Sequence, residues 1–397
     1  MLYRLTNPIQ NYAWGSTTSM NKLFGIANDE GKPQAEMWMG AHPNGCSTVE
    51  KDGKTTLLSD LIAANPIQVL GNKVYQQFGA DLPYLLKILA ADKPLSIQVH
   101  PEKSKAASGF ARENKMGLAP NAANRNYKDG NHKPELVYAL TPYKAMNGFR
   151  VIKETVALFE QAGVDILNDQ VAKLKANPDA EHLETFFKSL LSMEGELKDM
   201  ALDQLMTGID SKGSDEAAKF AFATIKDFAE EYPDDVGLFS PLMLNLIVLQ
   251  PGEAMFLHAE TPHAYLKGTG VEIMANSDNV LRAGLTPKYM DIPELIANTQ
   301  FTPIQNKDLH TAPVVEGGTN KFPVPVDDFA IEVTNIDGQT VENKADSAEI
   351  ILCLKGEVSI TNNGQSLTLK PSESAFIEAQ AGAYQCEGNG QFVRISA

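Results

Sequence analysis

The spacing of hydrophobic residues divides the chain into strand-like and helix-like zones. Residues 1–150 hold short hydrophobic runs broken by Pro and Gly, and the run LSIQVHP from Leu95 to Pro101 alternates with the period of a strand. Between residues 151 and 235 the period becomes helical, since LETFFKSLL places apolar residues at i, i+3, i+4 and i+7 from Leu183. We therefore expect a mainly β chain with an α-helical insert.

Strand texture returns from Leu246 and continues toward the C-terminus. The pattern predicts turns at Pro251-Gly252 and at Gly268–Gly270, because Gly and Pro interrupt the β-rich runs there. The sequence Asn362-Asn363-Gly364 predicts a β-hairpin.

Two segments of this β-rich part resemble each other. QPGEAMFLHAETPHAY, from Gln250, matches KPSESAFIEAQAGAYQ, from Lys370, at Pro, Glu, Phe and Ala in the same order. A repeat of this size indicates two copies of one small β-barrel. The first copy carries His258 and His263, whereas the second carries Glu378 and Ala383, so only the first is equipped to hold a metal. We interpret the second as a structural packing partner.

The charge of the chain narrows its possible partners. The 397 residues carry 34 Lys and Arg against 50 Asp and Glu, a net charge of −16. A chain this acidic repels nucleic acid and anionic membranes, and an anionic metabolite would need a local positive site. The helical zone, residues 151–235, holds 19 acidic residues against 8 Lys and no Arg, which we interpret as the solvated outer face of an insert.

Cysteine use and the N-terminus indicate where the protein acts. Cys46, Cys353 and Cys386 cannot all pair, and none has CxxC spacing, so we expect free thiols in a reducing compartment. The N-terminal segment lacks the basic and apolar regions of a signal peptide. The longest apolar stretch, residues 242–249, is far shorter than the ~20 residues of a membrane span. We expect a cytoplasmic protein.

Two strand-like segments and a histidine offer metal ligands. Gln98 and His100 are two residues apart, which points both side chains to one face of a strand. Lys133 and Glu135 form a second such pair, and His263 follows a turn. Two imidazoles, a carboxylate and an amide oxygen make a plausible ligand set for Zn²⁺, although a single His on a strand is more often an ordinary polar residue. The remaining histidines carry weaker signals: His42, His182, His258 and His310.

The segment SDNVLRAGLTPK gathers charged residues suited to an anion. It places Asp278, Arg282 and Lys288 in a stretch broken by Gly and Pro. Arg binds phosphate through its planar fork and Lys through a compact charge. The alternative interpretation is a set of ordinary surface charges on a loop.

Seven segments together resemble the type I mannose-6-phosphate isomerases (phosphomannose isomerases), a zinc-dependent family of the cupin class. They are NYAWG at 11–15, AEMWMGAHPNG at 35–45, LPYLLKIL at 82–89, SIQVHP at 96–101, HKPE at 132–135, PHAYLKG at 262–268 and ANSDNVLRAGLTPK at 275–288. The resemblance implies two cupin-like, jelly-roll β-barrels and a helical domain. On this basis we expect a catalytic barrel formed by residues 1–150 and 236–320, a helical insert at 151–235, and a C-terminal barrel at 321–397 without metal ligands.

The resemblance also implies an activity and a metal centre. The reaction would be the reversible interconversion of D-mannose 6-phosphate and D-fructose 6-phosphate, with one Zn²⁺ per chain. The implied ligands are Gln98, His100, Glu135 and His263, with His258 outside the set. The partner would be a small sugar phosphate, with no nucleic acid or membrane, and we expect a monomer.

Aldose–ketose isomerisation needs a base for the carbon-bound proton and stabilisation of an enediolate. The resemblance places Lys133, His132, Asp278 and Glu36 near the sugar, and it makes Arg282 catalytic. Our first choice for the base is Lys133, because positive charge from a nearby metal favours the neutral amine. A zinc-bound water or Glu36 is the alternative.

The remaining site residues take the following predicted roles. We expect Arg282 to stabilise negative charge, because its guanidinium is too basic to act as a base. His132 would serve ring opening. Ser96, Lys288 and Lys87 are candidates for the phosphate, and Trp14 for the wall of the pocket.

Two other functions remain open from the sequence. A cupin oxygenase would hold Fe²⁺ with two His and a carboxylate. A metal-dependent protein that binds sugar phosphates without turning them over would use the same residues.

Overall fold

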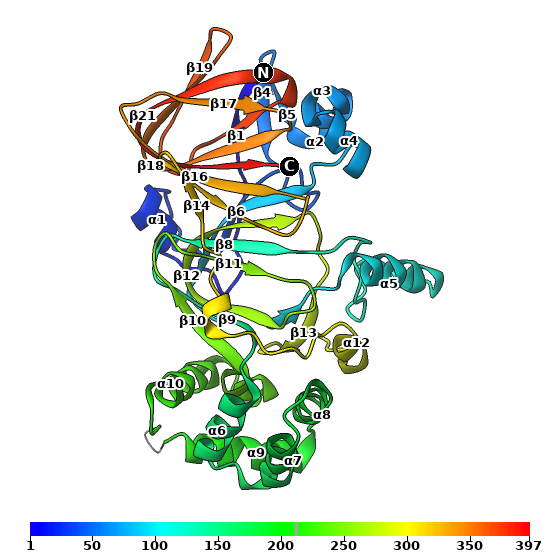
Figure 1. Ribbon diagram of the computed structural model, residues 1–397. Helices are drawn as coiled ribbons and strands as arrows, with labels where there is room; N and C mark the ends of the chain where they lie inside the picture. The colour runs from blue at the N-terminus through cyan, green and yellow to red at the C-terminus, as the bar shows by residue number, and fades with distance from the viewer. Residues whose placement is uncertain (211–212) are drawn as a thin grey trace.

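The computed structural model describes residues 1–210 and 213–397. Two β-barrels and a helical domain are stacked end to end, with the C-terminal barrel at one end and the helices at the other (Figure 1). This confirms the predicted fold class, a mainly β chain with two cupin-like barrels and an α-helical insert. No helix of the described ranges is long and apolar enough to cross a membrane.

The central barrel is a ten-stranded sheet within the described part of the chain. Its strands are β2 (Ile9–Gln10), β3 (Glu36–Met39), β6 (Tyr84–Ala91), β7 (Ile97–Val99), β8 (Glu135–Ala139), β9 (Tyr143–Phe149), β10 (Leu244–Leu249), β11 (Ala254–Leu257), β12 (His263–Ala275) and β13 (Leu281–Gly284). The long strand β12 organises the barrel, because it pairs with β6, β7, β8 and β9.

The second barrel is an eleven-stranded sheet, counted over the same described residues. It comprises β1 (Leu2–Thr6), β4 (Thr48–Lys51), β5 (Lys54–Leu57), β14 (Val314–Glu316), β15 (Thr319–Phe322), β16 (Ala330–Asp337), β17 (Val341–Ala345), β18 (Glu349–Asn362), β19 (Gln365–Leu369), β20 (Ser374–Ile377) and β21 (Gly382–Ser396). The predicted hairpin is the turn between β18 and β19, where Asn363 and Gly364 have φ of 47° and 82°.

Helices connect and flank the barrels. Those outside the insert are α1 (Ser19–Phe24), α2 (Leu58–Ala64), α3 (Pro66–Leu70), α4 (Asn72–Phe78), α5 (Lys103–Lys115) and α12 (Ile292–Ala297), with 3₁₀ turns η3 (Asn306–Asp308) and η4 (Ala379–Ala381). The insert contains α6 (Ile152–Ala162), η1 (Asp165–Leu167), α7 (Asn168–Ala176), α8 (Ala180–Leu191), α9 (Gly195–Gly208), α10 (Glu216–Glu231), η2 (Val236–Phe239) and α11 (Ser240–Met243).

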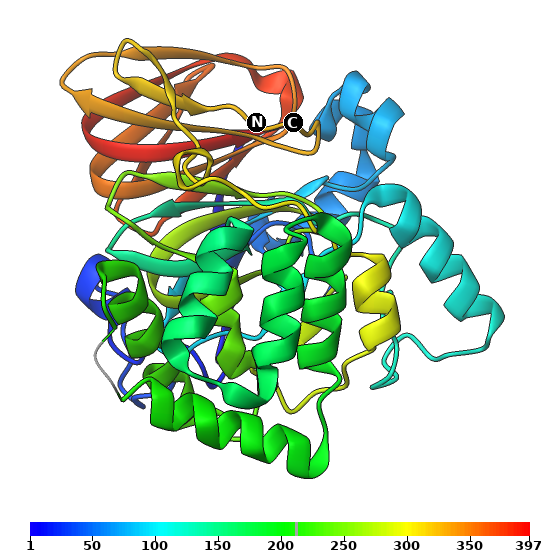
Figure 2. The same cartoon turned by 60° about the horizontal axis from the view of Figure 1, so that its bottom comes forward.

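The insert packs onto the central barrel through a shared aromatic core. The predicted apolar face of α8 is buried, and its Phe187 meets Phe149 of β9 edge-to-face at 5.3 Å between ring centroids. Phe301 stacks on Phe149 at the same distance. The insert helices lie side by side in front of the central barrel in the view of Figure 2. Because one core spans both parts, the insert is held firmly against the barrel.

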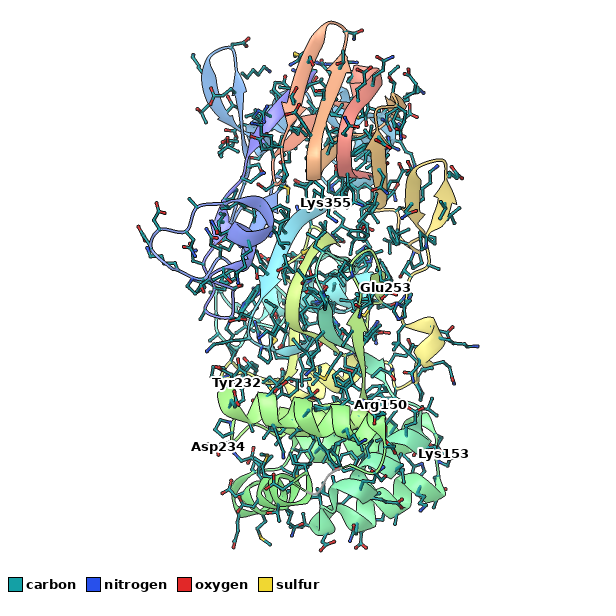
Figure 3. The ribbon with its side chains drawn as sticks, turned by 90° about the vertical axis from the view of Figure 1, so that its left-hand side faces the viewer. Arg150, Lys153, Tyr232, Asp234, Glu253 and Lys355 are labelled. Carbon is teal, nitrogen blue, oxygen red and sulfur yellow. The ribbon has the colours of Figure 1, made fainter. Side chains whose placement is uncertain are left out.

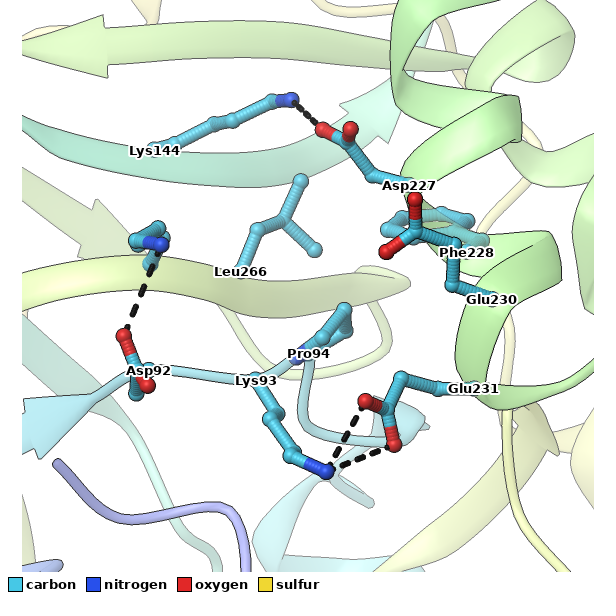
Figure 4. A pocket seen from close by; sticks show the side chains of 10 residues that line it. Asp92, Lys93, Pro94, Lys144, Asp227, Phe228, Glu230, Glu231 and Leu266 are labelled. Carbon is cyan, nitrogen blue, oxygen red and sulfur yellow. Dashed lines mark hydrogen bonds and ion pairs between the residues drawn. The ribbon is translucent and has the colours of Figure 1, made fainter.

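Polar contacts reinforce this junction. Arg150 lies where the chain leaves the barrel (Figure 3), and its Nε donates to the carbonyl of Pro241, where the chain returns. Figure 4 shows ion pairs on another side of the junction, Lys144 with Asp227 at 3.1 Å and Lys93 with Glu231 at 2.8 Å. Part of the acidity of the insert therefore serves contacts with the barrel, in addition to the solvated face we expected.

The structure differs from the sequence prediction in three respects. The turn predicted at Gly268–Gly270 is wrong, because both glycines lie inside the continuous strand β12. Gly268 has a φ of 132°, and a Cβ there would lie 2.7 Å from the carbonyl of Pro142, so glycine serves a close approach of strands instead of a turn.

The second and third differences concern the borders of the parts. The prediction makes residues 1–150 the first part of the catalytic barrel, but β1, β4 and β5 belong to the sheet of the C-terminal barrel, where Leu2 of β1 pairs with Ile377. The helical run extends to Met243, beyond the predicted border at residue 235. A local sequence pattern predicts that a segment is a strand or a helix, but it does not predict which sheet the strand joins.

Candidate active site

Three predicted ligands converge from strands far apart in the sequence. His100 directly follows β7, Glu135 begins β8 and His263 begins β12. Nε2 of His100 lies 3.3 Å from one Glu135 oxygen, and Nε2 of His263 lies 3.5 Å from the other. The three donor atoms lie within 4.8 Å of one another. Two ligand atoms of a tetrahedral zinc, each at about 2.1 Å, lie about 3.4 Å apart, so this spacing fits the ion.

Backbone carbonyls orient both histidine rings. Nδ1 of His100 lies 2.6 Å from the carbonyl oxygen of Asn279, and Nδ1 of His263 lies 2.8 Å from that of Thr261. Within residues 1–210 and 213–397, the buried Nε2 atoms of both rings have no hydrogen-bond partner. Burial lowers the pKa of His100 to about 4, which keeps its imidazole neutral. Imidazole rings held through Nδ1, with Nε2 free beside a carboxylate, are the arrangement of metal-binding histidines.

Gln98, the fourth predicted ligand, lies opposite His263. The two residues are directly paired between β7 and β12, and Gln98 is also paired with Arg282 of β13. Directly opposed residues project to the same face of a sheet. Gln98 also lines the hollow described next, which supports its predicted role.

A hollow of about 710 Å³ opens beside this cluster. Its walls include most of the predicted site residues: Trp14, Glu36, Lys87, Gln98, Lys133, Glu135, Asp278, Arg282 and Lys288. Trp14 contributes an aromatic wall and stacks on Tyr12 at 5.8 Å between ring centroids. Such a surface suits the C–H face of a sugar.

The predicted ligands His100 and His263 lie behind Glu135 and Gln98 and are not among the described residues that line the hollow, and two residues predicted to act on the sugar phosphate are also absent from its walls. His132 and Ser96 are absent from its walls as far as the described residues define them. Nε2 of His132 lies 2.9 Å from a carboxylate oxygen of Asp328, in the connection between β15 and β16 of the C-terminal barrel. The neighbouring Lys133 does line the hollow, and its Nζ lies 3.1 Å from Glu135.

Lys87 is paired with carboxylates inside the hollow. Its Nζ lies 2.9 Å from Glu272 and 3.6 Å from Glu36, and Glu36 also accepts a hydrogen bond of 2.6 Å from Nε1 of Trp38. Burial lowers the pKa of Lys87, but the attraction of these carboxylates outweighs it and raises the pKa above the ordinary value. A lysine already neutralised in this way is less suited to a phosphate than we expected from the sequence.

Three other cations at the hollow have no carboxylate partner. Across the described residues, Lys128, Arg282 and Lys288 form no ion pair within 4.0 Å. Burial lowers the pKa of each, and the charge of Arg282 lowers those of both lysines further. Cations that repel one another in this way are prepared for an anion with more than one charge.

Asp278 is held in place by two neighbours. Its carboxylate lies 3.3 Å from Nε2 of His42 and accepts a hydrogen bond of 3.1 Å from Nδ2 of Asn44. Burial raises the pKa of Asp278, but the His42 hydrogen bond and nearby positive charge outweigh it, so the pKa lies below its usual value. The carboxylate is therefore charged at neutral pH.

Sequence reasoning missed Lys128, Glu272 and His42 as members of the site. Lys128 lies on an irregular loop with no periodic pattern. Glu272 is opposite Lys87 in the pairing of β12 with β6, which no local pattern reveals. His42 is one of the histidines whose signal in the sequence is weak.

Three family models match successive parts of this architecture. Residues 2–152 match the model of the type I phosphomannose isomerase catalytic domain, residues 158–244 that of its helical insertion domain, and residues 318–397 that of the mannose-6-phosphate isomerase cupin domain.

Individual relatives match over nearly the whole chain. Mannose-6-phosphate isomerase of Salmonella typhimurium is 49% identical over 99% of both chains, and that of Homo sapiens is 36% identical over 90% of this chain and 88% of its own. A zinc-bound crystal structure of mannose 6-phosphate isomerase superimposes with a TM-score of 0.94 at 49% identity, covering 100% of this chain and 99% of that one.

Proposed function

The chain belongs to the type I phosphomannose isomerase family, and from this premise we propose that it interconverts D-mannose 6-phosphate and D-fructose 6-phosphate. One observation carries the proposal. A His/Glu/His donor set and three cations without carboxylate partners belong to the same site, which is the pair of features that a metal-dependent sugar-phosphate enzyme requires.

The metal is one Zn²⁺ per chain. His100, Glu135 and His263 would hold it, with Gln98 as the fourth protein ligand. When bound, it supplies Lewis-acid polarisation of the sugar oxygens at C1 and C2. The mixed nitrogen and oxygen donors and the spacing of the donor atoms support this choice.

The phosphate binds at Lys128 and Lys288. These cations are free of carboxylates, whereas Lys87 is held by Glu272 and Glu36. Lys87 would then face the sugar and not the phosphate. Ser96 does not line the hollow, so we do not include it among the phosphate-binding residues.

Lys133 removes the proton from C2 and returns it at C1. Its amine lies at the hollow beside Glu135, where a positioned side chain can transfer a proton to and from the sugar. Glu36 is the second candidate, but its carboxylate is already engaged by Trp38 and Lys87. Arg282 faces the same hollow with its charge free, so it stabilises the enediolate.

Ring opening falls to Asp278 supported by His42. Opening the pyranose needs proton transfer at O1 and the ring oxygen. Asp278 lines the hollow and is charged, whereas His132, which we first expected in this role, faces Asp328. The charged Asp278 therefore accepts the proton from O1 and delivers it to the ring oxygen as the bond between C1 and that oxygen breaks, and His42 holds the carboxylate in position.

We also propose that the enzyme is a cytoplasmic monomer whose only substrate partner is the sugar phosphate. The net charge of −16 disfavours nucleic acid and membranes, and the free thiols suit a reducing compartment.

A coupled assay tests the activity. Purified protein loaded with zinc should convert mannose 6-phosphate to fructose 6-phosphate. Tight binding of mannose 6-phosphate with no turnover would instead indicate a binding protein. Uptake of O₂ by an iron-loaded sample would indicate the oxygenase.

A further inference from the structure

Asn279 lies between the metal cluster and the loop that carries Lys128. Its side chain is fully buried, and its backbone carbonyl accepts the hydrogen bond from Nδ1 of His100 at 2.6 Å. That bond fixes the ring of a predicted metal ligand and leaves Nε2 free for the ion.

The side chain of the same residue clamps the loop from Lys128 to Asn131. Its Oδ1 accepts hydrogen bonds from the backbone N–H groups of Lys128 at 2.7 Å and Asp129 at 3.3 Å. Its Nδ2 donates to the carbonyls of Asp129 at 2.9 Å and Asn131 at 2.8 Å. One amide thus fixes a loop whose first residue faces the phosphate end of the hollow and whose continuation leads to Lys133.

We propose that Asn279 is a positioning residue that couples the metal centre to the phosphate end of the site. The inference rests on the proposed function. A metal at His100 fixes the backbone of Asn279, and its side chain then fixes Lys128 for the phosphate. Coupling of this kind is reciprocal, so bound phosphate strengthens metal binding by the same factor.

The substitution Asn279→Ala tests the coupling, because it removes the clamp and retains the carbonyl that meets His100. The loop keeps other attachments, since the backbone N–H of Asp278 and the hydroxyl of Ser277 still bind the Asp129 carboxylate at 2.8 Å. We expect the variant to bind stoichiometric zinc and to keep a kcat within about threefold of wild type. Its KM for mannose 6-phosphate should rise about tenfold, because a tenfold loss of affinity corresponds to the net contribution of about one hydrogen bond.

The decisive readout is a ratio of affinities. Calorimetry gives the affinity for fructose 6-phosphate of the zinc-loaded and the metal-free protein, and we expect the ratio of the two to fall severalfold in the variant. An unchanged ratio overturns the coupling, whatever happens to KM. The proposed function is tested by a different result, since it is wrong if the wild-type protein shows no turnover. The ratio of affinities does not depend on catalysis, so it tests the coupling alone.

A matched control separates coupling from general loss of packing. Asn362 is a buried asparagine of the C-terminal barrel whose amide donates to the carbonyls of Ala381 and Ala383 at 2.9 and 2.7 Å. Asn362→Ala should lower the thermal midpoint but leave KM and the affinity ratio unchanged. If Asn279→Ala does not fold, Asn279→Ser, which retains a polar group at the position, is read by the same ratio.

Discussion

His263 and His258 lie five residues apart, yet only His263 turns toward the metal cluster. The ring of His263 is fully buried with Nε2 3.5 Å from Glu135, whereas His258 is exposed at the end of β11. His263→Ala should therefore lose bound zinc and activity together. The loss of affinity should exceed the roughly 100-fold that removal of an outer hydrogen-bond partner costs. Metal analysis after dialysis measures it.

His258→Ala is the matched control for that change. This substitution also removes an imidazole from the same segment, and the variant should retain both zinc and turnover. Stoichiometric zinc in His263→Ala would refute the ligand role.

Lys133→Ala should keep zinc and lose proton transfer. The side chain lines the hollow beside Glu135, so its removal takes away the proposed base but none of the ligands. Removal of a general base slows a reaction by about a hundredfold to ten-thousandfold. Exchange of the C2 proton with solvent deuterium, followed by NMR, measures this step. Unchanged exchange would transfer the role to Glu36.

The alkaline limit of kcat/KM should lie below the range of an exposed lysine. Burial and the charge of Arg282 lower the pKa of Lys288, and only the protonated amine attracts phosphate. As pH rises through this lowered pKa, kcat/KM therefore falls. Lys288→Arg keeps the charge and should move the fall to higher pH, while Lys267→Arg, at an exposed ion pair with Asp92, should not. Identical profiles for all three proteins would exclude Lys288.

Arg394→Ala should destabilise the C-terminal barrel without touching the active site. Arg394 neutralises Glu332 at 2.8 Å and the buried Glu349 at 3.1 Å. Leaving a buried charge unpaired costs about 3–5 kcal/mol. Zinc content and KM should stay at wild-type values, because this barrel is proposed to be structural. Loss of zinc from the folded variant would contradict that assignment.

The same variant has a predictable pH dependence. Burial raises the pKa of Glu349 to about 7 from 4.5, even beside Arg394. An acid with a raised pKa in the folded state favours folding most below its unfolded pKa, and this contribution is lost as pH rises through 7. Without Arg394 this loss of stability at high pH should grow. The free energy of unfolding of the variant, measured by chemical denaturation, should therefore fall further below that of wild type at pH 8 than at pH 5.

The sequence predicts which residues are metal ligands, but it does not predict how the fold brings them together. Strand alternation in LSIQVHP predicts that Gln98 and His100 share a face, and local spacing also offers Glu135 and His263. The resemblance then selects His263 over His258. The convergence of the ligands depends on the pairing of β12 with β7 and β8, which joins segments far apart in the chain. Pairing of this kind is set by tertiary packing and leaves no local period.

Tertiary pairing also explains why some residues have other roles in the structure than the sequence predicts. Lys87 looked free in the sequence because its partner Glu272 comes from another strand. Lys128 was overlooked because irregular loops carry no periodicity, and its position depends on the Asn279 clamp. The turn predicted at Gly268–Gly270 failed because glycine permits both turns and close strand approach.

The most direct test of the account is metal content measured alongside isomerase activity before and after chelation. The zinc-loaded protein should hold one zinc per chain and convert mannose 6-phosphate to fructose 6-phosphate. Chelation should abolish both, and added zinc should restore both in the same proportion. Full activity in protein shown to hold no metal would contradict the account.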